Sequence, residues 1–324
     1  MKKNLKKRIF LGLVILFGTF IVVFLVLGFE FLPAELSIQR QAEKETFVIQ
    51  LGISETEVIS NLYNKGFIKS KNAFTETLNF KNWKGKINPG GYEISKEMWP
   101  WEITDVLVNH PSQKWVFIRE GLRKEEIAET LRVSLGWTNQ EKYDFLKEAE
   151  EGYMWPDTYL FKLNSSGKEM VKRMKNEFNE NFQELSKGAL ETNMRNDTVI
   201  ILASLIQREA ATDEEMPIIS GIMWNRLLSD HYLQIDAALQ YALGGAGNWW
   251  PRVTKQNYKM NSGYNTYIHK GHPPAPICSP GLAAIKSVIY PQETDYFYYI
   301  HDAESQVHYA KTYEEHLENI QKYL

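Results

Sequence analysis

The segment that decides the fold, residues 197–211, reads Asp197-Thr-Val-Ile-Ile-Leu-Ala-Ser-Leu-Ile-Gln-Arg-Glu-Ala-Ala211. Residues 198–206 carry no charge, so we expect a helix here to be buried in a core, with Asp197 as its N-cap. At 3.6 residues per turn, Glu209 falls on the same stripe as Leu202 and Leu205. The sequence therefore predicts a carboxyl group on an apolar stripe at the end of a buried helix.

The position of Glu209 has two interpretations. Apolar neighbours and the negative partial charge of a helix C-terminus both favour the protonated form of a carboxyl group. A carboxyl group that is protonated near neutral pH can act as a general acid. The alternative is an ordinary surface glutamate beside Arg208 at a fraying helix end. This segment alone leaves both interpretations open.

The N-terminus predicts a membrane anchor. Residues 9–29 are uncharged and, as a helix, would be about 30 Å long, which matches the hydrocarbon core of a bilayer. The basic tail of residues 1–8 keeps the N-terminus in the cytoplasm by the positive-inside rule. A signal peptide would need a small-residue cleavage site, and Glu30-Phe-Leu-Pro-Ala-Glu35 offers none. We therefore expect an uncleaved single-pass anchor in the cytoplasmic membrane, with the rest of the chain outside the cytoplasm.

The composition fits one anchor on a water-soluble body. The formal net charge of the 324 residues is -3, and five positive charges precede the apolar segment, so the remainder is mildly acidic. Nucleic-acid binding is therefore not expected. Roughly 290 residues outside the membrane suffice for one large or two modest domains. Aromatic residues make up 13% of the chain, and they suit sugar faces as well as protein cores.

The cysteine and histidine patterns do not favour thiol or metal chemistry. Cys278 is the only cysteine, so an intrachain disulfide is excluded, and we expect a packed thiol. The seven histidines include no HExxH motif, and His269-Lys-Gly-His272 alone is a weak metal signal. We therefore expect neither a metal nor another cofactor.

A repeat organises the region after the anchor. Residues 30–44 are interpreted as a linker, and residues 45–112 as a small β-α-α-β module of the LysM type. Val48-Ile49-x-x-Gly52 is matched 69 residues later by Phe117-Ile118-x-x-Gly121, and each copy predicts a strand, a glycine turn and a helix. LysM-type modules bind glycan. The alternative, a repeat that serves only folding, stays open.

Residues 113–324 are predicted to form a larger mixed α+β domain, because strands and helices do not alternate regularly. Asp213, Glu214 and Glu215 are interpreted as solvated charges after the buried helix. The other predicted elements are helices at 167–188, 217–228 and 281–290, a loop-like run at 233–244, strands at 296–300 and 308–310, and a terminal helix from 312.

Five blocks in a fixed order carry a resemblance to a known family. They are Ala203-Ser-Leu-Ile-Gln-Arg-Glu-Ala210, Ile222-Met-Trp-Asn-Arg-Leu227, Leu233-Gln-Ile-Asp236 with Gln240-Tyr-Ala-Leu-Gly244, Tyr264-Asn-Thr-Tyr267, and Gly271-His-Pro-Pro-Ala-Pro-Ile-Cys-Ser-Pro-Gly-Leu-Ala-Ala-Ile-Lys286. Together they resemble the endolytic murein transglycosylase MltG (YceG-like) family. The resemblance runs from the anchor to Lys311-Thr-x-Glu-Glu-His316 and so covers nearly the whole chain.

The resemblance implies roles for individual residues. Glu209 matches the catalytic glutamate of the family. Many members have Glu-x-Glu in that block, and here Gln207 occupies the first position. The residues that match substrate-binding positions are Gln234, Asp236, Gln240, Tyr264, Asn265 and Asn225. For Asn225 and its neighbour Arg226, the alternative is a structural bridge.

The resemblance also implies a reaction. A lytic transglycosylase cleaves the bond between N-acetylmuramic acid and N-acetylglucosamine in peptidoglycan and leaves a 1,6-anhydro end. One carboxyl group serves as acid and then as base, whereas most glycoside hydrolases need two. Such enzymes are expected to cut nascent strands and end their elongation beside peptidoglycan synthases in the membrane. The alternative is a non-catalytic scaffold that binds peptidoglycan within the wall-synthesis machinery.

Overall fold

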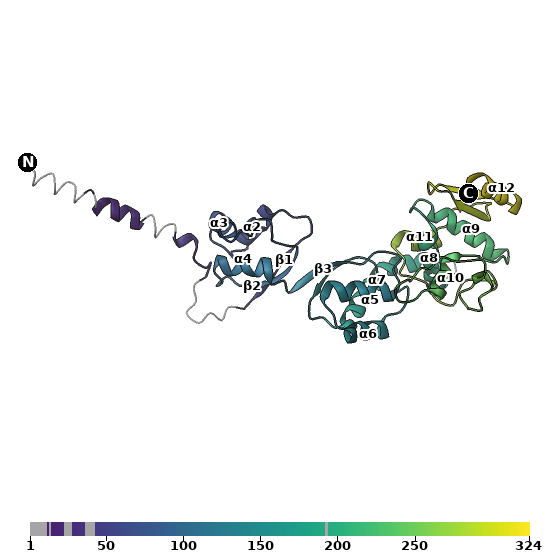
Figure 1. The fold of residues 1–324 in the computed structure, drawn as a ribbon, viewed down its shortest axis with the longest axis horizontal. Helices are drawn as coiled ribbons and strands as arrows, with labels where there is room; N and C mark the ends of the chain where they lie inside the picture. Colours follow the sequence, from purple (N-terminus) through teal and green to yellow (C-terminus); the bar gives the residue numbers. More distant parts are fainter. Residues whose placement is uncertain (1–11, 13, 23–27, 36–42, 192–193) are drawn as a thin grey trace, which may run out of the picture. The chain divides into compact units, whose positions relative to one another are not determined.

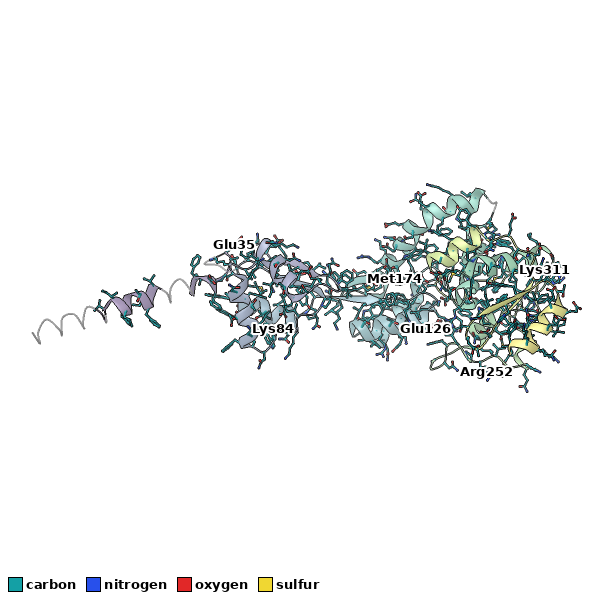
Figure 2. The ribbon with its side chains drawn as sticks, turned by 90° about the horizontal axis from the view of Figure 1, so that it is seen from above. Glu35, Lys84, Glu126, Met174, Arg252 and Lys311 are labelled. Carbon is teal, nitrogen blue, oxygen red and sulfur yellow. The ribbon has the colours of Figure 1, made fainter. Side chains whose placement is uncertain are left out.

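The protein has a mixed α+β fold, described by a computed structural model over residues 12, 14–22, 28–35, 43–191 and 194–324. The chain divides into two compact units, Met1–Trp115 with Leu160–Leu163, and Val116–Tyr159 with Asn164–Leu324. Glu35 and Lys84 belong to the first unit, and Glu126, Arg252 and Lys311 to the second (Figure 2). We describe each unit separately.

The first unit follows the predicted β-α-α-β order. Its elements are β1 (Glu45–Ile49), α2 (Glu55–Asn64), α3 (Lys71–Phe80), β2 (Gly90–Ile94) and α4 (Pro100–Asn109). Strands β1 and β2 are antiparallel, with Thr46 opposite Glu93. The sheet has the order β1-β2-β3-β4, in which β3 is Gln113–Phe117 and β4 is Thr158–Lys162. Helices α2, α3 and α4 lie beside these strands (Figure 1). Leu62, Phe74 and Ile103 are fully buried between them and form the centre of the core.

The predicted repeat is present as two glycine turns. Gly52 follows β1 with φ +76°, and Gly121 follows β3 (Gln113–Phe117) with φ +74°. Only glycine adopts this left-handed conformation without a steric cost. In each copy a helix begins three residues after the glycine, α2 in the first and α5 (Lys124–Leu135) in the second. The 69-residue spacing therefore corresponds to a repeated strand–turn–helix unit.

The second unit is mainly helical. Its further elements are α6 (Asn139–Glu148), α7 (Gly167–Glu191), α8 (Asn196–Glu209), α9 (Met216–Leu228), α10 (Asp236–Leu243), η1 (Asn257–Lys259), α11 (Leu282–Ile289), β5 (Tyr298–His301), β6 (Val307–Ala310) and α12 (Tyr313–Tyr323). Helix α8 contacts α7, α9, α10 and α11 (Figure 1). All side chains from Val199 to Ile206 are buried, as predicted. The apolar segment is therefore the central helix of this core.

Two local predictions for this unit were wrong. Asp197 is not the N-cap of α8, because Arg195 takes that place and the Asp197 carboxylate instead accepts hydrogen bonds from the Arg195 guanidinium. The run 233–244 is not a loop, since residues 236–243 form α10. The prediction of a packed thiol is confirmed, because Cys278 is fully buried.

The predicted membrane span lies partly outside the described residues, which omit 9–11, 13 and 23–27. Within the described part of the chain, no helix combines the length and the apolar character needed to cross a bilayer. Residues 14–22, which lie inside the predicted span, are described and helical. The side chains of Leu16 and Phe17 are 71% and 66% exposed.

Candidate active site

The carboxyl group of Glu209 lies at the end of α8 and is partly buried. The hydroxyl of Tyr299 on β5 donates a hydrogen bond of 2.8 Å to Glu209 Oε2. The backbone N–H of Ala237, in the first turn of α10, also donates to this carboxylate. Glu209 is thus held where α8, α10 and β5 meet.

Burial raises the pKa of Glu209, and the nearby Asp236 carboxylate raises it further. The Tyr299 hydroxyl, the Ala237 N–H and the charge of His301 act in the opposite direction. Burial and the proximity of Glu209 also raise the pKa of Tyr299, so the phenol stays protonated and remains a donor.

Asp236 approaches Glu209 from the first turn of α10. It is exposed, and its Oδ1 accepts a hydrogen bond of 2.6 Å from the Tyr267 hydroxyl. Thr266 fixes the preceding residues, since its carbonyl accepts from the Gln234 N–H at 3.1 Å and its hydroxyl accepts from the Ile235 N–H at 2.8 Å. The loop that carries Tyr267 therefore also positions the start of α10.

Asn225 and Arg226 hold the site together from α9. Asn225 Nδ2 donates to the carbonyls of Thr294 and Tyr296 at 2.7 and 2.9 Å, just before β5. Arg226 Nε donates to the Phe297 carbonyl at 2.6 Å, and Arg226 Nη1 donates to the Leu233 carbonyl at 2.5 Å. The structural bridge that was the alternative for this pair is thus present, because these bonds tie β5 and the start of α10 to α9.

The other predicted binding residues differ in accessibility. Gln234 is exposed, with φ +53°, and Gln240 lies one turn along α10 from Asp236. Tyr264 is partly buried, with its ring centroid 4.9 Å from that of Tyr241. Asn265 is fully buried, and its amide donates to the carbonyls of residues 258 and 260 and accepts from the Tyr267 N–H. Asn265 therefore shapes the loop that presents Tyr267.

Sequence reasoning missed Tyr299, Tyr267 and His301. The strand containing Tyr299 was predicted, but no pattern connects it to a glutamate 90 residues earlier. His301 Nε2 lies 3.0 Å from Oε2 of Glu215. The prediction that Glu215 is solvated was wrong, since its side chain is only 13% exposed and it also accepts from the Ala211 N–H.

Two further carboxyl groups in this unit have a raised pKa. Burial raises the pKa of Glu151 to about 8, although its carboxylate accepts from the Lys124 N–H at the start of α5. Burial and the charge of Asp213 raise the pKa of Glu120, which is hydrogen-bonded to Gln207. Gln207 therefore contacts Glu120, whereas Glu209, two positions later on the same helix, contacts Tyr299.

The chain is similar to several known proteins. A protein of Bacillus subtilis named endolytic murein transglycosylase is 27% identical over 335 residues, covering 93% of this chain and 91% of that protein. A Streptococcus pneumoniae protein of the same name is 30% identical over 177 residues, covering 54% of this chain and 32% of that protein. The crystal structure of a YceG-like protein from Listeria monocytogenes superposes with a TM-score of 0.61 at 25% identity, covering 85% of this chain and 98% of that one. The profile of the YceG-like family matches residues 47–322, and the chain belongs to this family.

Proposed function

We propose that this protein is an endolytic lytic transglycosylase that cleaves peptidoglycan glycan strands between N-acetylmuramic acid and N-acetylglucosamine. The observation that carries the proposal is the partly buried Glu209, whose pKa is raised and whose Oε2 accepts from Tyr299. Its similarity to proteins named endolytic murein transglycosylase supports the same reaction.

In the proposed mechanism, Glu209 acts twice. As the acid it protonates the glycosidic oxygen, and the bond from that oxygen to the muramyl C1 breaks. As the carboxylate it then takes the proton of the muramyl 6-hydroxyl, whose oxygen bonds to C1 and closes the 1,6-anhydro ring. No water is consumed, and Glu209 ends protonated, as it began, with a proton taken from the 6-hydroxyl.

Asp236 supports this reaction electrostatically in the proposal. Its carboxylate raises the pKa of Glu209 and so helps keep the acid protonated before cleavage. An anionic group beside the site also stabilises the positive charge that develops at C1 in an oxocarbenium-like transition state. Tyr267, bonded to Asp236, fixes the orientation of that carboxylate.

We also propose that residues 9–29 anchor the enzyme in the cytoplasmic membrane, with the N-terminus in the cytoplasm and the catalytic unit outside. The uncharged sequence supports this, as do the exposed apolar side chains of the described helix at residues 14–22. At this location the substrate would be nascent glycan beside peptidoglycan synthases, and cleavage would end strand elongation. The small first unit is proposed to bind glycan in the manner of a LysM module.

Product analysis tests the reaction. The full-length protein is incubated with nascent glycan or purified sacculi, and the fragments are measured by mass spectrometry. We expect fragments that end in 1,6-anhydro-N-acetylmuramic acid and are one water lighter than reducing ends. Ordinary reducing ends would identify a hydrolase instead. Glycan binding without any cleavage would favour the scaffold.

A further inference from the structure

The first unit carries an aromatic hollow of about 520 Å³ on its surface. The hollow is lined by Phe31, Glu76, Thr77, Phe80, Lys81 and Trp101. The Phe80 side chain is 91% exposed and Trp101 is 41% exposed. Two large aromatic side chains this open beside a hollow indicate a binding surface, because soluble domains seldom leave such patches uncovered.

The last residue of the predicted membrane span and the residues that follow it contact this same unit. The Lys69 ammonium lies 4.4 Å from the centre of the Phe29 ring. The Ser70 hydroxyl donates to Glu30 Oε2 at 2.9 Å, and the Glu35 N–H donates to the Lys96 carbonyl at 2.9 Å. Between these contacts, Phe31 lies in the wall of the hollow. The residues directly after position 29 are therefore packed against the module.

We propose that this hollow is a membrane-docking surface, and that Phe80 and Trp101 rest in the lipid headgroup layer of the bilayer that residues 9–29 span. The inference relies on the proposed membrane anchor. Phe31 is two residues beyond the predicted span, so at most about 7 Å of chain separates it from the end of the span. The wall of the hollow consequently cannot lie far from the lipid surface.

The side chains suit a lipid surface. Aromatic residues concentrate at membrane–water interfaces, where their rings contact the outer ends of the acyl chains. Trp101 is stacked on Trp99 with ring centroids 4.5 Å apart, which makes this part of the rim rigid. The Lys81 ammonium donates to the Trp101 carbonyl and lies 4.3 Å from the centre of the Trp83 ring, so it ties the rim to a third tryptophan.

Exposed lysines follow the lining of the hollow in the sequence. Lys84 and Lys86 are exposed in the turn that follows Lys81, and Lys84 is visible on this unit in Figure 2. Glu76 is the acidic residue in the lining. Lysines near an anionic lipid surface add attraction that salt weakens. Docking of this kind would hold the first unit at the membrane.

The test uses the full-length protein in vesicles of phosphatidylcholine and phosphatidylglycerol with headgroup-proximal spin-labelled lipid as quencher. A small fluorophore is attached at Phe80→Cys or, in a second variant, at Glu76→Cys. Both positions are exposed, so neither substitution disturbs the core, and the native Cys278 is fully buried. The matched control is Leu228→Cys on the second unit, whose side chain is 82% exposed. A label at Val22→Cys reports on the anchor and is measured with lipid that is spin-labelled deep in its acyl chain, because residue 22 lies roughly 10 Å inside the predicted span.

We expect quenching at positions 80 and 76 to exceed that at 228 several-fold. If the label at 22 is quenched while those at 80 and 76 behave like the one at 228, the docking inference is wrong and the anchor stands. If the label at 22 is not quenched, the anchor and the docking inference both fail. Product analysis of the same protein reports separately on the proposed reaction.

Discussion

Two glutamates at opposite ends of helices, one in each unit, have opposite environments. Glu57 lies in the first turn of α2, where the backbone N–H and hydroxyl of Ser54 donate to its carboxylate at 2.9 and 2.7 Å. These bonds lower the pKa of Glu57. Glu209 lies in the last turn of α8, where burial raises its pKa. One residue type thus stabilises a helix as an anion in the first unit and is kept near protonation in the second.

The difference follows from what surrounds each carboxyl group. A helix N-terminus offers unpaired N–H donors and a positive partial charge, which stabilise an exposed carboxylate. A helix C-terminus offers neither, and partial burial removes the water that would otherwise solvate the charge. Acid–base chemistry is therefore expected at Glu209, and helix capping at Glu57.

The largest expected effect is that of Glu209→Gln. Gln cannot transfer a proton, so we expect the cleavage rate to fall roughly 10²–10⁴-fold. The measurement is the release of anhydro-ended fragments over time, with glycan pull-down to show that binding persists. Glu120→Gln is the control, because Glu120 is the other carboxyl group attached to α8 through Gln207. A larger loss of cleavage in Glu120→Gln than in Glu209→Gln would mean that Glu209 is not the general acid.

The next effect concerns stability and Glu151. Its pKa is raised from 4.5 to about 8 in the folded protein, so the folded state holds the proton more tightly than the unfolded chain. The resulting stabilisation by the proton is lost as pH rises from about 4.5 to about 8. Glu151→Gln is therefore expected to be more stable than wild type at pH 9, by roughly 2–4 kcal/mol, and close to it at pH 5.

Urea unfolding at both pH values measures this difference. Glu150→Gln is the neighbouring control, since its side chain is 62% exposed and pairs with Lys175 at the surface. A Glu151→Gln variant whose stability relative to wild type is the same at pH 5 and pH 9 would contradict the buried, proton-binding state of this group.

A smaller effect is expected from Tyr299→Phe. The Tyr299 hydrogen bond lowers the pKa of Glu209, so its removal raises that pKa. The alkaline limb of the pH–activity profile, where the acid loses its proton, should then move upward by about one pH unit, and cleavage itself should persist. Tyr298→Phe is the matched control on the same strand. Superimposable profiles for the two variants would exclude the proposed influence of Tyr299.

The smallest effect is expected in the first unit. Ser54→Ala removes the N-cap of α2 and should lower the free energy of unfolding by about 1 kcal/mol. The Ser54 hydroxyl also donates to the Glu57 carboxylate, and the backbone N–H of residue 54 donates in both proteins. Because the hydroxyl bond contributes to the lowered pKa of Glu57, the difference from wild type should shrink as pH falls below 4.5 and Glu57 takes up a proton. Thermal unfolding between pH 3 and pH 7 measures it. Loss of cleavage activity in Ser54→Ala would contradict a role of this cap in stability alone.

Much of the local structure followed from the sequence. The buried helix, the two glycine turns, the terminal strands and the packed Cys278 were predicted from periodicity and residue type, and all are present. The errors occurred where a residue type was interpreted without its partner, which lies two residues away for Asp197 and on β5 for Glu215. Asp197 looked like a cap, but its carboxylate pairs with Arg195, and Glu215 looked solvated, but it packs against His301.

The sequence by itself determined that Glu209 ends a buried helix and that the chain belongs to a family with one catalytic glutamate, because apolar runs and ordered motifs are local properties. Only the tertiary structure decided what surrounds that carboxyl group. Tyr299 reaches it from 90 residues away along the chain, and Asp236 arrives on a short helix whose start is fixed by Thr266 and Arg226. Burial and hydrogen-bond partners set a pKa, and both depend on packing between distant segments, which residue spacing does not encode.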